Sequence, residues 1–293
     1  LIQRYPKSQY VPKTLFALAE GYEAVADFDD AADHYERYAS NYEKSKGPAK
    51  RPAAKSKTAP APSAEQVWEE QKAQDSLYNA GVFRDGLGQY KQALKNREKF
   101  LELWPKSKDA EAVTKSIIDL HEKMALWTKA QKLYEEYEKD QIKDPSKLLW
   151  AEGRIASIYE EKLKNKTGAR KIFIRILDYY EKLNKKQKEA LDIQALDGVA
   201  RASFVMNEDD FKRYSGIKLK WTTLQNIGEL KGSIKTKAKG LEDIQKAYTK
   251  TVQFKSADPA ICALARIGLA YDQFAEALSN PPVPKGIPEE LLF

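Results

Sequence analysis

The sequence is poor in the residues that most often carry chemistry. Its 293 residues include a single cysteine, Cys262, and two histidines, His34 and His121. A lone cysteine excludes an intrachain disulfide, and zinc sites need clustered cysteines or histidines that this sequence lacks. No apolar run reaches the roughly 18 residues of a membrane-spanning helix. These shortages argue against a metal centre and against a disulfide-stapled scaffold.

A catalytic constellation is also missing from the sequence. His121 occupies a position that favours packing in a core, His34 is expected to be exposed beside Asp33, and Cys262 opens a helix with no evident base, which favours a buried thiol. The segment GVFRDGLG (Gly81–Gly88) lacks the preceding strand and the Lys-Ser/Thr pair of a phosphate-binding loop. We therefore expect no enzyme activity, catalytic residue, metal, cofactor or small-molecule substrate.

A repeating helical pattern is what the sequence does contain. Leu15, Leu18, Ala19 and Tyr22 follow one another at spacings of 3, 1 and 3, and a small alanine and an aromatic recur further on, at Ala31 and Tyr35. Small residues let two antiparallel helices approach closely, while the large residues fill the space around them. Strand-like alternation is absent, so the pattern predicts an all-α protein.

This pattern resembles that of the tetratricopeptide repeat (TPR) family. The position of Tyr22 recurs at Arg84, His121 and Tyr159, the last two after 37 and 38 residues, and Leu264–Tyr271 reads as another first helix of a repeat. The resemblance implies a right-handed α-solenoid of TPR and TPR-like antiparallel helix pairs. Arg84, Arg97 and His121 stand where aromatic residues are usual, so those two repeats are expected to pack less typically.

Three similar phrases punctuate the repeats, namely RYPKS, NYEKS and LWPKS at residues 4–8, 41–45 and 103–107. Proline stops a helix and serine caps the next one, so we interpret all three as turns between repeats. The gap between the last two is longer because an insertion lies between them. That insertion, Lys44–Ala64, holds six basic residues and no acidic one. It is expected to be disordered, as a tolerated loop or as a basic tether.

The expected organisation has five parts. They are a TPR helix pair at 1–44, a Lys/Pro/Ala linker at 45–66, a TPR array at 67–185, degenerate TPR-like helical repeats at 186–280 and a Pro-rich loop at 281–293. Within the degenerate part, LQNIGEL (Leu224–Leu230) and LEDIQKAYTKTV (Leu241–Val252) each read as an amphipathic helix. The chain begins and ends inside repeat-like text, as expected of an excised fragment.

An acidic residue follows the Tyr22-type position in each of the five clear repeats. The concave face of a solenoid is built mainly from first helices, so these side chains should point into it. With two flanking acids and two aromatic anchors, the candidate partner-binding residues are Phe16, Glu20, Glu23, Tyr78, Asp85, Asp119, Glu122, Glu160 and Asp272. The hypothesis is an acidic groove that receives a basic or amine-bearing segment. Ordinary solvated surface charge is the alternative.

The net charge of +7 is unevenly distributed. Residues 20–36 carry seven acids and no Lys or Arg, whereas residues 162–188 carry ten bases and two acids. Residues 212–250 carry ten bases and three acids. The basic half could contact an anionic surface, or could simply be solvated. Nucleic acid is not expected, because the aromatics sit at packing positions instead of on an exposed stacking platform.

The YP-K-S punctuation resembles that of bacterial envelope TPR proteins, including outer-membrane-assembly lipoproteins and periplasmic cell-division coordinators. The stretch KAKGLEDIQKAYTKTVQF and the segments after it resemble large TPR proteins of gliding-motility machinery. These resemblances imply a non-catalytic scaffold of a periplasmic or outer-membrane-associated assembly, with other envelope subunits as partners. The alternatives are a cytoplasmic location, and an adaptor that makes peripheral contact with a membrane or the cell wall through its basic C-terminal half.

Overall fold

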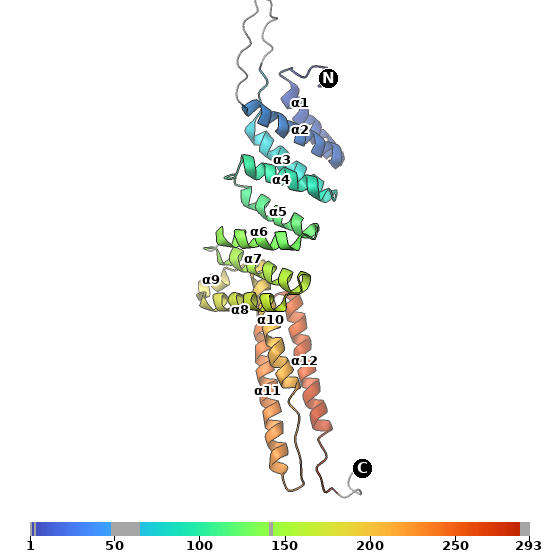
Figure 1. Ribbon diagram of the computed structural model, residues 1–293, viewed down its shortest axis with the longest axis vertical. Coiled ribbons are helices and arrows are strands. Elements are labelled where there is room, and N and C mark those ends of the chain that lie inside the picture. Colours follow the sequence, from blue (N-terminus) through green and yellow to red (C-terminus); the bar gives the residue numbers. More distant parts are fainter. Residues whose placement is uncertain (1, 3, 48–64, 141–142, 288–293) are drawn as a thin grey trace, which may run out of the picture. The chain divides into compact units, whose positions relative to one another are not determined.

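The computed structural model describes residues 2, 4–47, 65–140 and 143–287, and these form twelve α-helices and one π-helical turn. The prediction of an all-α solenoid of TPR-like helix pairs is confirmed (Figure 1). The chain divides into two units, Leu1–Ala130 and Gln131–Phe293. Most of the expected linker, residues 48–64, lies outside the described residues, as does the end of the expected Pro-rich loop from residue 288.

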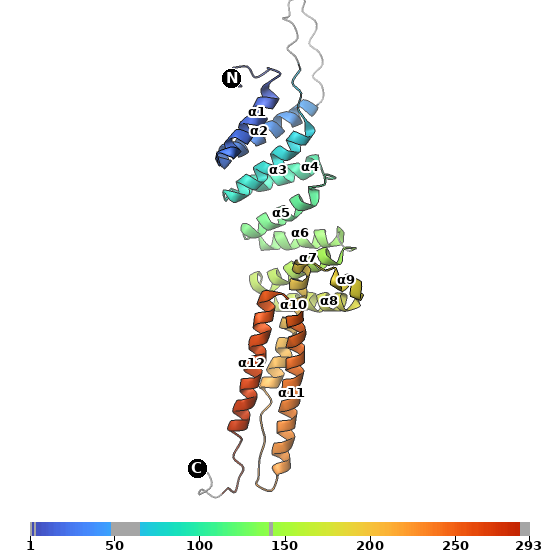
Figure 2. The same cartoon turned by 180° about the vertical axis from the view of Figure 1, so that it is seen from behind.

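The first unit is a stack of helices in which each packs against its neighbour in the sequence. Figure 2 shows the same order from behind. The helices are α1 (Val11–Ala24), α2 (Phe28–Lys46), α3 (Glu70–Gly86), α4 (Tyr90–Leu103) and α5 (Ala110–Lys123). The next helix, α6 (Trp127–Asp140), contains the boundary between the two units.

Small residues set the close packing of these helices. Ala19, Ala32 and Ala80 are completely buried and form one cluster with the buried ring of Tyr35. Phe16 packs edge-on against Tyr35, with ring centroids 5.6 Å apart. The alternation of small and aromatic residues that defined the repeat in the sequence is therefore the core of the first unit.

The turns within the helix pairs confirm the repeat register. Ala26, Gly88, Ala125 and Lys164 have positive φ values of 61°, 74°, 57° and 54°. Each lies at the same repeat position, just after a first helix, where a left-handed residue commonly ends a helix. Only one of the four is glycine, so the turn geometry outweighs the steric cost of a side chain at the other three positions.

One of the three punctuating phrases is not a turn. RYPKS precedes α1 and LWPKS lies at the end of α4, but NYEKS lies inside α2. The reason is that Glu43 replaces proline, so nothing removes a backbone donor or blocks the helix there. The Ser45 hydroxyl instead donates a hydrogen bond back to the Tyr42 carbonyl oxygen at 2.6 Å.

Arg84 replaces the usual aromatic residue without leaving the core. Its side chain is 5% exposed, and its guanidinium pairs with Glu36 at 2.9 Å, with Asp29 at 2.5 Å and with Asp33. The hydrogen bond to Glu36 raises the pKa of Arg84 further, against the opposing effect of burial. Three of the acids between residues 20 and 36 therefore form ion pairs with one buried cation.

Arg97 also replaces an aromatic residue, and its charged side chain is buried against an aromatic ring. Its guanidinium lies over the Tyr78 ring, 4.7 Å from the centroid, and burial lowers its pKa. Gly81 makes the room, because a Cβ there would lie 2.8 Å from the Arg97 Nε atom. His121 is buried, as predicted, and its Nδ1 atom lies 2.8 Å from the Ile117 carbonyl oxygen. The departures from the repeat pattern are thus packed inside the helix stack.

The second unit joins shorter helices to three long ones. After α6, its elements are α7 (Pro145–Ser157), η1 (Ile158–Lys162), α8 (Lys166–Lys182), α9 (Lys185–Glu189), α10 (Ile193–Ser215), α11 (Ile227–Gln253) and α12 (Ala257–Ser279). The last three have 23, 27 and 23 residues and pack against one another. Tyr248, Phe211 and Ile244 belong to their shared core.

The two amphipathic segments expected between residues 224 and 252 form one helix. Most of LQNIGEL and all of LEDIQKAYTKTV lie in α11, which continues without a break through Gly232 and Gly240. Neither glycine adopts a positive φ, and no proline interrupts the segment. No helix-ending residue therefore separates the two segments, and they continue as one helix.

The expected burial of Cys262 is wrong, because its side chain is exposed. The inward face of α12 carries Pro259, Ala263 and Ala270. Position 262 precedes Ala263 by one residue, which turns its side chain about 100° around the helix from this inward face, so it points toward solvent. The thiol has no structural task in the described packing of this helix.

Glu152 on α7 gives the second unit a predicted pH dependence. It is 3% exposed, and burial raises its pKa to about 7 although the Arg175 Nε atom lies 2.8 Å from its Oε1 atom. Between about pH 4.5 and 7 the folded chain therefore holds a proton that the unfolded chain has released, so stability falls as pH rises. Glu152→Gln is expected to flatten this slope and to add about 2 kcal/mol at pH 8.

Urea unfolding of both proteins at pH 5 and pH 8 checks this prediction. Because every other titrating group is shared, the difference between the two proteins isolates Glu152. Equal pH slopes for the two proteins would contradict the assignment.

Candidate functional site

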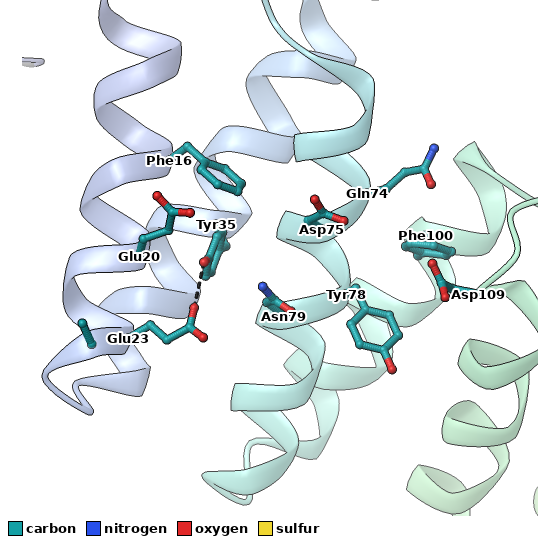
Figure 3. A pocket seen from close by; sticks show the side chains of 11 residues that line it. Phe16, Glu20, Glu23, Tyr35, Gln74, Asp75, Tyr78, Asn79, Phe100 and Asp109 are labelled. Carbon is teal, nitrogen blue, oxygen red and sulfur yellow. Dashed lines mark hydrogen bonds between the residues drawn. The ribbon is translucent and has the colours of Figure 1, made fainter.

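A hollow of about 690 Å³ opens on the first unit between α1 and α3. Figure 3 shows Glu20 and Glu23 on α1 facing Asp75 and Asn79 on α3. Three other elements contribute, because Tyr35 comes from α2, Phe100 from α4 and Asp109 from the turn before α5. The residues that line it are Phe16, Glu20, Glu23, Ala24, Tyr35, Gln74, Asp75, Tyr78, Asn79, Phe100 and Asp109.

Four aromatic rings give this acidic hollow an apolar wall. Phe16 packs against Tyr35 on one side, and the Tyr78 and Phe100 rings lie 6.5 Å apart on the other. The Tyr35 hydroxyl donates a hydrogen bond to the Glu23 Oε2 atom at 2.8 Å. Burial and the Glu23 carboxylate both raise the pKa of Tyr35, so the phenol stays protonated and keeps the carboxylate in place.

The four carboxylates of the acidic hollow are Glu20, Glu23, Asp75 and Asp109. Glu23 accepts from a neutral phenol, and Asp75 accepts from the Gln71 amide at 2.9 Å. Within the part of the chain that the structure describes, none of the four forms an ion pair with Lys or Arg. Carboxylates beside apolar walls attract a cation more strongly than carboxylates in open water.

The predicted site residues divide between the hollow and other places. Phe16, Glu20, Glu23 and Tyr78 line it, and the groove anchors proposed from the sequence are thus brought together with two of the acids. Asp119 and Glu122 lie on α5 and do not line it.

The remaining three predicted acids are engaged or distant. Asp85 accepts both hydrogen bonds of the Lys123 ammonium group, at 2.6 and 2.7 Å. Glu160 belongs to the second unit and lies 3.0 Å from the Arg201 Nη2 atom. Asp272, also in the second unit, is exposed on α12. The rule of one acid per repeat therefore places only Glu23 in the hollow.

Sequence reasoning missed Gln74, Asp75, Asn79, Tyr35, Phe100 and Asp109 as lining residues. A signal for some of them exists, because residues 75, 78 and 79 share one helix face at spacings of three and four. Tyr78 was already a candidate, so its neighbours on that face were open to the same inference. Asp109 carries no such signal, since the turn after α4 brings it to the hollow only in the folded chain.

In the folded chain, several basic residues of the C-terminal half form ion pairs with acids that lie far away in the sequence. Arg170 pairs with Asp209 and Lys250 with Glu181, each at 2.5 Å, and both partners lie far away along the chain. Arg201 pairs with Glu160 and Glu161. Charge counts over short segments therefore overstate the cationic surface that an anionic membrane would meet.

Neither a cluster of metal ligands nor a membrane-spanning helix occurs among the described residues. No group of three or more His, Cys, Asp or Glu side chains is arranged to hold a metal ion among the residues described. Within the same residues, no helix combines the length and apolarity needed to cross a bilayer. What the hollow offers is a binding surface of carboxylates, amides and aromatic rings.

Comparison with known proteins adds little detail. No family model and no curated protein matches the chain. Among solved structures, a tetratricopeptide repeat protein from Parabacteroides merdae aligns with a TM-score of 0.38 and 15% sequence identity, over 96% of this chain and 96% of that chain. The TPR-like character of the present chain is established by its own helix pairs and their recurring turn.

Proposed function

We propose that this protein is a non-catalytic interaction scaffold that holds a basic segment of a protein partner in the acidic hollow of its first unit. The observation that carries the proposal is the meeting of four carboxylates, none paired with Lys or Arg in the described chain, with four aromatic rings in one concavity. Helical-repeat folds of this kind usually present such concave surfaces to other proteins.

The chemistry of the acidic hollow favours a Lys or Arg side chain over a neutral one. The aliphatic stem of either residue packs on aromatic rings while its charged end reaches carboxylates. The faces of two rings are already occupied, since Lys72 lies 5.6 Å from the Phe16 centroid and Arg97 lies over Tyr78. We therefore place the recognised cation among Glu20, Glu23 and Asp75, between these rings.

A volume of about 690 Å³ falls within the usual range of ligand sites. It suits a short extended segment with one or two long side chains inserted, and is too small for a folded domain. Binding should weaken with added salt, because the attraction acts partly through solvent.

Removal of two of the carboxylates tests this proposal. The double variant Glu20→Gln with Asp75→Asn is expected to bind a fluorescent Lys/Arg-rich nonapeptide at least about tenfold more weakly than the wild type. Fluorescence anisotropy at two salt concentrations measures the change. A Glu-rich peptide of equal length serves as the negative probe.

A matched control removes two acids of the same unit that lie outside the hollow. Asp30→Asn with Glu98→Gln changes the net charge equally, yet should leave the affinity within about twofold. If both double variants lose the same affinity for the peptide, the loss comes from the change in net charge, and the proposal of a specific site is wrong.

We further propose that the partner belongs to a bacterial envelope assembly of the motility or outer-membrane type. The support is the YP-K-S punctuation between repeats, which resembles that of envelope TPR proteins. Fractionation of the source cells tests the location. Recovery with the periplasm or outer membrane is expected, and recovery only in the cytosol would contradict it.

A further inference from the structure

A pocket of about 520 Å³ opens on the second unit, where the end of α8, the short helix α9 and the end of α11 meet. Its floor is apolar, because Leu191 and Phe254 line it and are almost completely buried. The Tyr180 ring meets the Phe254 ring edge-on, with the two centroids 5.3 Å apart. The pocket thus offers an aromatic and aliphatic surface that a side chain from outside can contact.

Three lysines line the same pocket, and we call it the lysine-rimmed pocket. They are Lys185 and Lys188 of α9 and Lys255 just after α11, and Glu189 is the one acid among the described residues that line it. Lys185 is 91% exposed and its Nζ atom lies 3.9 Å from the Glu189 Oε1 atom, so it stays open to a further partner. Lys255 is exposed and forms no ion pair within the described part of the chain. The rim therefore carries a surplus of positive charge.

The acid beside the lysine-rimmed pocket does not neutralise this charge. Glu181, at the end of α8, lies 2.5 Å from the Lys250 Nζ atom and 3.6 Å from the Lys188 Nζ atom. The hydrogen bond from Lys250, together with the charge of Lys188, lowers the pKa of Glu181, so one carboxylate is shared by two cations. Lys182 and Lys186, on the same two short stretches of helix, are exposed and have no acidic partner among the residues that the structure describes. At this place the positive charge of the sequence remains available in the folded chain.

Although α9 has only five residues, its first turn is fixed. The Asn184 side chain accepts a hydrogen bond from the Gln187 backbone amide at 2.9 Å, and the Gln187 side chain accepts one from the Asn184 backbone amide at 3.0 Å. This reciprocal arrangement is a capping box. Lys188 is held in addition by Tyr180, whose ring centroid lies 4.7 Å from the Lys188 Nζ atom. Ammonium groups on an ordered helix lose less conformational entropy on binding than those on a mobile segment.

We propose that the lysine-rimmed pocket binds an acidic segment of a protein partner, which inserts one apolar side chain and places Asp or Glu side chains on the lysines. The apolar floor accounts for the inserted group, and the positive rim accounts for the acids that flank it. The last carbonyl groups of α11, beside Phe254, carry partial negative charge, so carboxylates should stay at the rim instead of entering. This site is additional to the acidic hollow, because it lies on the other unit and favours the opposite charge.

An anionic membrane is the main alternative for a basic surface. Lysines on an open face meet a bilayer surface through their charges alone, and that surface cannot enter a pocket of this size. The floor formed by Tyr180, Leu191 and Phe254 would then have no part in binding. Because the lysines occur together with this concave apolar floor, a peptide with an apolar anchor fits the site better.

Fluorescence anisotropy of the full chain with a labelled nonapeptide, in which Glu residues flank one central Phe, tests the proposal. Saturable binding that weakens with added salt is expected. The Glu-rich peptide without an apolar residue should bind at least about tenfold more weakly, because it lacks the anchor. The double variant Lys185→Gln with Lys255→Gln should weaken binding of the Phe peptide at least about tenfold. Both lysines are exposed, so the variant should remain folded, which circular dichroism checks.

A matched control replaces two exposed lysines near the other end of α11. Lys231→Gln with Lys235→Gln changes the net charge equally and should leave the affinity for the Phe peptide within about twofold. The Glu20→Gln with Asp75→Asn variant should bind this peptide as the wild type does, so the lysine-rimmed pocket and the acidic hollow are tested separately.

Three results would overturn the proposal. They are no saturable binding of the Phe peptide at protein concentrations up to about 500 µM, equal affinities for the two acidic peptides, and equal losses of affinity in the two double lysine variants. Cosedimentation with phosphatidylglycerol vesicles that depends on Lys185 and Lys255, without binding of the Phe peptide, would assign these lysines to a lipid surface instead.

Discussion

Arg84→Ala is expected to lower the free energy of unfolding of the first unit by about 3 kcal/mol. The change removes a buried guanidinium that holds Glu36, Asp29 and Asp33 on α2 against α3. The three carboxylates would then repel one another, and a cavity would open where the side chain packed. These acids are partly exposed, so solvent screens part of the loss, and the estimate stays below that for a fully buried pair.

Hydrogen exchange of peptides from α2 and α3 measures this effect within the unit where it arises. Arg37→Ala is the control, because Arg37 lies on α2 and is exposed. It should change stability by less than about 0.5 kcal/mol. Equal loss of protection in the two variants would mean that Arg84 acts only as surface charge.

Gly198→Val is expected to destabilise the second unit by about 3 kcal/mol, at the upper end of the usual cost of overpacking. A Cβ on Gly198 would lie 3.0 Å from the Leu149 carbonyl oxygen and 3.4 Å from the Gly153 Cα atom. Both are backbone atoms, so they cannot turn aside as a side chain would. The α7 and α10 helices would have to separate.

Gly232→Val is the matched control for this substitution. A Cβ on Gly232 meets nothing within 4 Å, so valine there should be nearly neutral or slightly stabilising. Thermal unfolding of both variants gives the comparison. If the two substitutions lower the midpoint of thermal unfolding equally, the close packing of α7 on α10 is not the reason why position 198 requires glycine.

The architecture of the first unit could be predicted because its repeat is defined by the spacing of small and aromatic residues close together in the sequence. Ala19, Tyr35 and Ala80 are recognisable from positions three, four and nine residues apart, and all three are buried. The extent of α11 was harder to predict, because its length depends on the absence of a helix-ending signal at Gly232 and Gly240. A glycine alone does not distinguish a helix end from a helix interior.

The candidate site was partly predictable for the same reason. Phe16 and Tyr78 occupy equivalent repeat positions, and both line the acidic hollow. The acid that follows the Tyr22-type position proved less informative, since Asp85 and Glu160 have basic partners close by. Such pairing joins residues tens of positions apart, and a single sequence gives no signal for it.

Hydrogen exchange of the full chain with and without a Lys/Arg-rich nonapeptide tests the central claim most directly. The peptide should slow exchange in α1 and α3, whose residues Glu20, Glu23 and Asp75 line the acidic hollow. The helices of the second unit should be unchanged. Protection confined to the second unit, or none at peptide concentrations that saturate binding, would contradict the account.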